Sequence, residues 1–208
     1  MIIQKGFKQL STDAQVVFKK VLQALSEPGL CIEYDYEGLY WPNLHPTTTG
    51  LFLSLCDVDT PIGGDSALLN EEIRKSLAFH TQSPFVNNVS EANFVLFDET
   101  VSLDILTLLA KGSALSPENN CTVVIQCSGK KIENRTESPP KLELNLSGPG
   151  IPDQRTFAID NLTLASGIVQ YLIKGRPKFP MGLDFIFTTS NTFIGLSRTT
   201  KVEVKPCM

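Results

Sequence analysis

The chain has 208 residues, of which 42% are hydrophobic and 19% are charged, ordinary values for a soluble globular protein. Its formal net charge is −4 and its pI is about 5.2, which argues against nucleic acid or an anionic membrane surface as the main partner, because both require a basic face. No apolar stretch approaches the ~18 residues of a membrane span. A local basic pocket for a phosphorylated ligand remains compatible with this composition.

The amino-terminal sequence lacks the apolar core and the cleavage site of a secretion signal, and we therefore expect a cytoplasmic protein. The five cysteines contain no CxxC pair, and the chain has only two histidines, so few residues could ligate zinc. We interpret the cysteines as buried thiols and expect no metal. They are Cys31, Cys56, Cys121, Cys127 and Cys207.

The first half of the chain predicts helices separated by short apolar segments. The first helix has an N-cap box at its start, in which a threonine oxygen and a glutamine three residues later satisfy free amides. In chain order, we expect a helix from Thr12 to a stop at Pro28-Gly29, a strand over 30–34, a helix over 47–56, a loop through Gly63-Gly64, and a helix from Asn70 to Phe79.

The second half contains short apolar runs that suit strands buried on both faces of a sheet. Helical and apolar strand segments interleave, which predicts an α/β fold with a mixed β-sheet flanked by helices. No linker or repeat divides residues 1–208, so we expect a single domain. The expected elements are a strand over 93–97, a helix over 102–110, a strand over 122–127, a polar loop over 129–141, an alternating strand over 141–147, a helix over 162–173 capped by Asn161, and a hairpin of 183–187 with 192–196.

No standard nucleotide-binding loop is present. Gly148-Pro149-Gly150 is the nearest segment, but it lacks the lysine of a P-loop and has a proline where an amide donor would help. A tight turn after the strand over 141–147 is the simplest interpretation. The alternative is a glycine turn that allows a ligand or a partner chain to approach the backbone.

Two carboxylates, Asp57 and Asp59, stand beside Thr60-Pro61. Carboxylates at this spacing could bind magnesium or share a proton. They could equally end a helix, because aspartate side chains accept hydrogen bonds from free amides in turns.

We expect His80 at the end of a helix. In this position it could act in acid–base chemistry, bind an anion, or cap the helix. His45 is expected in a surface turn. Neither histidine has the neighbours that mark a Ser/His or Cys/His nucleophilic pair.

Arg198 precedes two threonines after an apolar strand, a combination suited to a phosphate or a carboxylate, although threonines are also common at strand ends. Asp184 stands among apolar strand residues, where a carboxylate is costly unless it is paired. A link between Asp184 and Arg198 across the expected hairpin would satisfy both. No lysine has a recognisable pyridoxal-phosphate setting, and we expect no cofactor; the candidates considered are Lys111, Lys174 and Lys178.

Taken together, short pieces along nearly the whole chain resemble one family, the H subunit (PhnH) of the bacterial carbon–phosphorus lyase core complex. No single piece is specific, and their order carries the resemblance. The pieces are Phe18, Ala24–Gly29, Leu55-Cys56-Asp57, Thr60-Pro61, Phe79-His80-Thr81, Ala92–Asp98, Gly112, Pro117-Glu118, Gly148–Ile151, Phe179-Pro180, Gly182, Asp184 and Arg198-Thr199-Thr200.

Two positions depart from the family pattern. Ser197 stands where the family typically has a proline, which relaxes the backbone before Arg198. Asn93 stands where an aspartate is usual, which removes a charge.

The resemblance implies a fold like the large domain of pyridoxal-phosphate-dependent transferases without the cofactor. It also implies a homodimer that joins the G, I and J subunits. Such an assembly supports transfer of the ribose triphosphate part of ATP to an alkylphosphonate, with adenine displaced, and the I subunit is the expected seat of catalysis.

This chain would then be an accessory subunit, and a non-catalytic scaffold that only organises the other subunits is the alternative. A standalone pyridoxal-phosphate enzyme is disfavoured. If a site for ATP or phosphonate exists on this chain, we expect His80 and Arg198 near an anion, with Asp57 close by.

Overall fold

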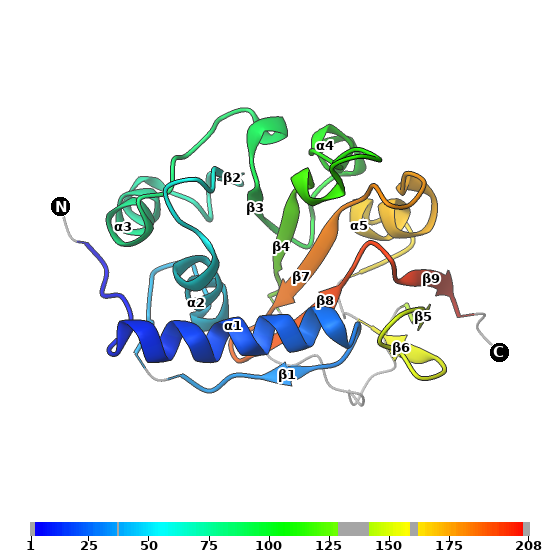
Figure 1. The fold of residues 1–208 in the computed structure, drawn as a ribbon, viewed down its shortest axis with the longest axis horizontal. Helices are drawn as coiled ribbons and strands as arrows, with labels where there is room; N and C mark the ends of the chain where they lie inside the picture. Colours follow the sequence, from blue (N-terminus) through cyan, green and yellow to red (C-terminus); the bar gives the residue numbers. More distant parts are fainter. Residues whose placement is uncertain (1–2, 37, 129–141, 159–161, 206–208) are drawn as a thin grey trace.

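The computed structural model describes residues 3–36, 38–128, 142–158 and 162–205, and its centre is a mixed sheet of six strands (Figure 1). The strand order is β1-β8-β7-β4-β3-β2. The strands are β1 (Ile32–Glu33), β2 (Ile62–Gly64), β3 (Phe94–Asp98), β4 (Thr122–Gln126), β7 (Asp184–Thr188) and β8 (Thr192–Leu196). The predicted mixed α/β sheet is therefore confirmed.

Four neighbouring strands, β2, β3, β4 and β7, run parallel. The predicted hairpin is confirmed, because β8 returns antiparallel to β7, with Phe185 opposite Leu196. Strand β1 then pairs antiparallel with β8 at the sheet edge. The parallel strands begin together on one side of the sheet and end together on the opposite side. We call the side where β3 and β4 end the carboxyl edge, and the side where they begin the amino edge.

Helices cover both faces of this sheet (Figure 1). The first three helices share one apolar core with the sheet, and the last two share a second core on the opposite face. The helices are α1 (Leu10–Ser26), α2 (Pro46–Leu55), α3 (Glu71–Thr81), α4 (Leu103–Leu108) and α5 (Gly167–Gln170), and α5 continues into a π-helical turn, Tyr171–Gly175. Short 3₁₀ turns are Val89–Glu91 and Pro117–Asn119. None of the helices in the described ranges is both long and apolar enough to cross a membrane.

Of two helix starts predicted from capping residues, one is confirmed and one is wrong. The predicted cap of α3 is confirmed, since the Asn70 side chain accepts a hydrogen bond from the Ile73 amide at 3.0 Å. The predicted start of α1 at Thr12 is wrong. The helix begins at Leu10, and the Asp13 carboxylate reaches back to the Gln9 amide at 2.9 Å.

Glycines 63 and 64 were expected in a loop, and this prediction is wrong. They belong to β2, which pairs with Phe94–Leu96 of β3. At Gly64, where φ is +130°, a Cβ atom would lie 2.2 Å from the Leu96 carbonyl oxygen. The glycines are needed because β3 approaches this backbone closely. This is a tertiary contact, and the local sequence therefore does not indicate the strand.

The helix predicted over 162–173 begins later, at Gly167, because the Thr163 amide instead donates to the Ser166 hydroxyl at 2.9 Å in the preceding turn. Its predicted cap, Asn161, lies outside the described residues. The polar loop predicted over 129–141 and the thiol of Cys207 lie outside them too.

A second, three-stranded antiparallel sheet has the order β6-β5-β9. Strand β5 (Leu144–Ser147) falls within the predicted strand over 141–147, and its burial alternates as expected. Strands β6 (Arg155–Phe157) and β9 (Lys201–Val204) were not predicted.

The cysteine thiols in the described residues are unbridged, as expected. Cys56, Cys121 and Cys127 are buried, and burial raises the pKa of each thiol, that of Cys121 to about 12. These groups therefore stay protonated near neutral pH and are poor nucleophiles.

Candidate functional site

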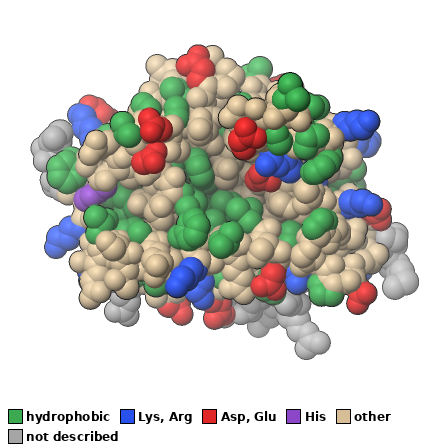
Figure 2. Space-filling view, viewed as in Figure 1, with side chains coloured by type: hydrophobic (Ala, Val, Ile, Leu, Met, Phe, Trp, Pro, Cys, Tyr) green, Lys and Arg blue, Asp and Glu red, His purple; other side chains and the backbone are tan. Residues whose placement is uncertain are grey.

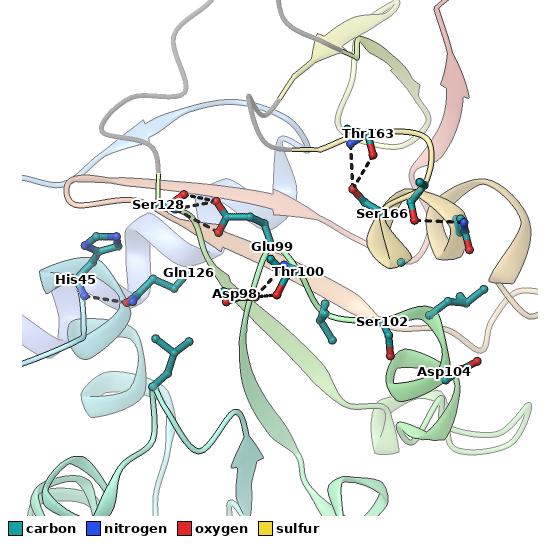
Figure 3. Close-up of a pocket in the computed structure, with 16 residues that line it drawn as sticks. His45, Asp98, Glu99, Thr100, Ser102, Asp104, Gln126, Ser128, Thr163 and Ser166 are labelled. Carbon is teal, nitrogen blue, oxygen red and sulfur yellow. Dashed lines mark hydrogen bonds between the residues drawn. The ribbon is translucent and has the colours of Figure 1, made fainter.

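An open cleft of about 1020 Å³ lies at the carboxyl edge of the sheet, beside the ends of β3 and β4. Ligands of open α/β sheets bind at this edge as a rule, because loops diverge where parallel strands end. Figure 3 labels most of the polar residues that line it: His45, Asp98, Glu99, Thr100, Ser102, Asp104, Gln126, Ser128, Thr163 and Ser166; Gln170 is a further polar lining residue.

The end of β3 delivers the first group of these side chains. Asp98 closes the strand, and its Oδ1 accepts hydrogen bonds from the Thr100 amide at 2.8 Å and the Thr100 hydroxyl at 2.5 Å. Ser102 then caps α4 by accepting from the Ile105 amide at 3.4 Å. A tight turn and a helix cap thus fix the cleft wall between β3 and α4.

The end of β4 holds the start of α2. The Gln126 side chain accepts from the His45 amide at 2.9 Å and donates to the Asn43 carbonyl at 2.7 Å. The His45 ring donates from Nε2 to the Cys127 carbonyl at 3.0 Å, which leaves Nδ1 as an acceptor when the ring is neutral. The prediction of His45 in a surface turn is therefore wrong, because the ring is fixed against β4 and lines the cleft.

Glu99 ties the two strand ends together. Its side chain is only 6% exposed, and its carboxylate accepts from the Ser128 amide at 3.0 and 3.2 Å and from the Ser128 hydroxyl at 2.5 Å. Such donors compensate a buried carboxylate. The floor of the cleft is therefore held in place by hydrogen bonds between the segments that follow β3 and β4 (Figure 3).

Gly167 brings α5 against α4 on the far side of the cleft. A Cβ atom at this position would lie 2.3 Å from the Leu103 amide nitrogen and 2.5 Å from the Val101 carbonyl oxygen. Only glycine allows this approach. The close contact places Thr163 and Ser166 along the same cleft as Ser102 (Figure 3).

The cleft is acidic. Its charged lining consists of Asp98, Glu99 and Asp104, and none of its described lining residues is a lysine or an arginine. A phosphate or phosphonate group would meet no cation among them. Carboxylates and hydroxyl groups instead suit ligand donors such as sugar hydroxyls or amino groups. The described residues contain no group of three His, Cys, Asp or Glu side chains that could hold a metal ion.

The predicted site residues lie elsewhere. His80 is in the last turn of α3, where its Nε2 donates to the Gln4 carbonyl at 2.8 Å and its ring packs 5.1 Å from that of Phe79. The ring therefore bonds to the amino-terminal segment, and not to a carbonyl of its own helix as a C-cap would. Because α3 leads back from the end of β2 to the start of β3, His80 lies toward the amino edge.

Asp57 also lies at the amino edge, between α2 and the start of β2. Its Oδ1 accepts from the Asp59 amide at 3.1 Å and from the Thr60 hydroxyl at 2.6 Å. The interpretation of this pair as a helix-ending turn is confirmed.

The predicted link between Asp184 and Arg198 is confirmed. The Arg198 amide donates to Asp184 Oδ1 at 2.7 Å, and Arg198 Nε lies 3.7 Å from Oδ2. Asn120 donates to the same Oδ2 at 2.9 Å, and Arg198 Nη1 donates to the Pro117 carbonyl. Ser197, the departure from the family pattern, bonds the Thr199 hydroxyl at 2.8 Å and so keeps the turn before Arg198 ordered.

Two other candidate motifs make contacts within the fold. At Gly150 a Cβ atom would lie 1.9 Å from the Ser26 carbonyl oxygen, so the glycine turn admits the end of α1 rather than a ligand. The Lys111 ammonium donates to carbonyls at the end of α4, including that of Leu109 at 2.9 Å. Burial lowers the pKa of Lys111.

Sequence reasoning missed the cleft although a signal was present. Two buried strands in succession end in polar residues, β3 in Asp98 with Glu99-Thr100 following, and β4 in Gln126 with Ser128 two residues later. The carboxyl ends of adjacent parallel strands lie side by side, so these residues could have been predicted to line one site.

The fold and the cleft define an α/β protein with a mixed sheet, helices on both faces, and an acidic, hydroxyl-lined cleft at its carboxyl edge. Residues 5–203 match the model of the family described as "Bacterial phosphonate metabolism protein (PhnH)". The chain belongs to this family, as the sequence resemblance indicated.

Two curated relatives are similar over most of their length. The subunit PhnH of alpha-D-ribose 1-methylphosphonate 5-triphosphate synthase from Rhizobium meliloti (strain 1021) is 26% identical over 191 residues, which cover 92% of this chain and 90% of the relative. The putative C-P lyase subunit protein HtxG from Stutzerimonas stutzeri is 28% identical over 191 residues, covering 92% and 86%.

Proposed function

We propose that this chain is a subunit of a carbon–phosphorus lyase complex. In that role it supports transfer of the ribose triphosphate part of ATP to an alkylphosphonate, with adenine displaced. The observation that carries this proposal is the family match over residues 5–203, together with relatives of nearly the same length that are named as subunits of such a complex.

The proposed role is accessory, with the main catalytic groups on the I subunit. The chemistry of the cleft supports this division. ATP and phosphonate are anionic, and the described cleft lining offers three carboxylates and no lysine or arginine. The phosphate groups therefore require cations from outside this lining, whereas the ribose hydroxyls could donate to Asp98 or Asp104.

The fold is proposed to correspond to the large domain of pyridoxal-phosphate-dependent transferases without the cofactor, arranged as a single domain. A lysine would be needed to form a Schiff base with that cofactor, and none lines the described cleft. We propose a cytoplasmic homodimer that assembles with the G, I and J subunits.

Co-expression with the G, I and J subunits, with purification through a tag on this chain, tests the subunit role. We expect a stoichiometric complex that releases adenine from ATP when methylphosphonate is added. A chain that purifies without these subunits, while they are expressed and soluble, contradicts the proposal.

The alternative is a scaffold whose cleft binds nothing. Asp104→Asn in the cleft tests it, with Asp59→Asn as the matched control, because Asp59 is an exposed aspartate in the turn at the amino edge. If the cleft contributes, Asp104→Asn lowers the rate of adenine release about tenfold in an intact complex, and Asp59→Asn does not. Equal rates favour the scaffold.

A further inference from the structure

A second, smaller hollow opens at the carboxyl ends of β2 and β3, beside the cleft. The chain leaves β2 for α3 on one face of the sheet, and it leaves β3 for α4 on the opposite face. Where neighbouring connections depart to opposite faces, a crevice forms outside the strand ends, and open α/β sheets bind ligands in such crevices. The hollow has a volume of about 450 Å³, within the range of small-molecule sites. We call it the β2–β3 hollow.

The β2–β3 hollow and the cleft have part of their lining in common. Four residues on the path from β3 into α4 line both spaces, and we call them the shared wall: Asp98, Thr100, Val101 and Ser102. Figure 3 shows Asp98, Thr100 and Ser102 one after another along this path. A ligand that lies across the shared wall would therefore contact both spaces at once.

One part of the β2–β3 hollow is apolar. Phe97 and Val101 are each only 6% exposed, and Ile105 of α4 is 36% exposed. Val89, from the 3₁₀ turn before β3, completes this part of the lining. A flat or compact ring would gain free energy here by removing apolar surface from water.

The remaining side chains of the β2–β3 hollow offer hydrogen-bond acceptors. Asp65 follows β2, and its Oδ1 accepts from the Ala67 amide at 2.6 Å, whereas no described residue donates to its Oδ2. Asp98 is bonded in the same way, because Thr100 donates to its Oδ1 and no described residue donates to its Oδ2. Each carboxylate therefore has an oxygen that can accept a hydrogen bond from a ligand.

The charges around the two spaces indicate which ligand groups fit. None of the described lining residues of either space is a lysine or an arginine. On the face of the molecule shown in Figure 2, basic side chains are interspersed with acidic ones. A phosphate group would therefore find no basic partner in this lining, whereas hydroxyl and amino groups would find acceptors.

We propose that this chain binds the nucleoside part of a nucleotide, with the base in the β2–β3 hollow and the ribose against the shared wall. The base carries an amino group that donates to Asp65, and a ribose hydroxyl donates to Asp98 Oδ2. The phosphate groups extend out of this lining and add little to the affinity of the chain. This inference rests on the proposed function, because ATP is the nucleotide of that reaction.

The test is isothermal titration calorimetry of the full-length chain with adenosine. We expect saturable binding, and ATP should bind within about fivefold of adenosine because its phosphates meet no cation here. Inosine has a carbonyl oxygen in place of the amino group and would face the Asp65 carboxylate, so it should bind about tenfold more weakly. 2′-Deoxyadenosine should also lose about tenfold, because it lacks a hydroxyl that donates to Asp98.

Matched variants test where the nucleoside lies. Asp98→Asn should weaken adenosine binding about tenfold, whereas Asp59→Asn at the amino edge should not. Asp65→Asn presents an amide donor and should reduce or reverse the preference for adenosine over inosine. Ile105→Trp fills the hollow and should abolish binding, whereas Leu108→Trp, on the same helix but outside both linings, should bind as the wild type does. Urea unfolding of each variant distinguishes loss of the site from loss of the fold.

Each outcome bears on the inference or on the subunit role. Absence of adenosine binding to the chain, or ATP binding tighter than the fivefold margin, overturns the inference. Displacement of adenosine by an equal concentration of ethylammonium also overturns it, because the carboxylates would then hold a simple cation. Adenosine binding by a chain that captures no G, I or J subunit supports the nucleoside site and overturns the subunit role. Adenine release by the assembled complex without adenosine binding to this chain overturns the nucleoside site alone.

Discussion

The two edges of the central sheet are built in different ways. At the carboxyl edge, side chains from strand ends and helix starts leave an open cleft whose charged lining residues are Asp98, Glu99 and Asp104. At the amino edge, the loops before β4, before β7 and after β8 are joined through Asp184, and the half-buried Arg176 and Arg198 donate to backbone carbonyls of these loops. One edge is therefore open enough to admit a small ligand, whereas the other is closed by hydrogen bonds between its loops.

The largest expected effect comes from breaking the amino edge at its centre. Asp184→Ala removes the acceptor for Asn120 and for the Arg198 amide and leaves the half-buried Arg198 guanidinium without its carboxylate. We expect the free energy of unfolding to fall by about 2–4 kcal/mol, measured by urea denaturation. Asp184→Asn, which keeps one acceptor, should lose less. Equal stability of wild type and Asp184→Ala would show that the loops at the amino edge are not held together by this residue.

A smaller loss is expected at the carboxyl edge. Gly167→Ala places a methyl group against the Leu103 backbone and forces α5 away from α4. The expected cost is about 1–3 kcal/mol, measured in the same way. Ser166→Ala, one residue earlier, is the control for a change that adds no volume, and it should cost less. A stable Gly167→Ala variant would mean that the two helices can separate freely.

The histidine at the amino edge provides a weaker test of the division between the edges. His80→Ala removes the hydrogen bond to the Gln4 carbonyl and should cost about 0.5–1.5 kcal/mol in urea denaturation. If ligand contact belongs to the cleft, adenine release by the assembled complex stays at the wild-type rate. A large loss of turnover with normal assembly would instead support the site predicted at His80, Asp57 and Arg198.

The smallest effect is expected from a group on neither edge. The hydrogen bond from the Tyr36 hydroxyl, 2.6 Å from Asp13 Oδ2, lowers the pKa of Asp13 below its usual 3.8. A lowered pKa stabilises the folded state above pH 3.8, and this stability is lost as the pH falls through the folded value. Tyr36→Phe should therefore cost a few tenths of a kcal/mol at pH 7, because the carboxylate is exposed, and less at pH 3. A cost independent of pH would exclude this linkage.

Much of the sheet could be predicted from the sequence because its strands are short apolar runs with clear ends. Phe94–Asp98, Thr122–Gln126 and the hairpin of β7 with β8 lie within a residue or so of their expected positions. Strand β2 could not be recognised, because its glycines are required by the close approach of β3 and form no local strand pattern. The pairing of Asp184 with Arg198 was predictable because an acid within an apolar strand requires a partner.

The cleft was harder to predict because its residues are individually ordinary. Thr163 and Ser166 reach it only through the contact at Gly167, which joins segments more than 60 positions apart. For His45 the local sequence indicated only a turn, because the Cys127 carbonyl that holds its ring is far away in the sequence. A histidine, an arginine and an aspartate attract attention in a sequence, but the geometry of the strand ends decides where a ligand can sit.

Helix α4 has a consequence for how the two edges could communicate. Its N-cap residue, Ser102, lines the cleft, and its last residue, Leu108, lies toward the amino edge; its six residues span about 9 Å. A short helix moves as a stiff rod, and the Gly167 contact leaves little space between it and α5. A displacement of Leu108 would therefore move Ser102 as well, and with it one wall of the cleft.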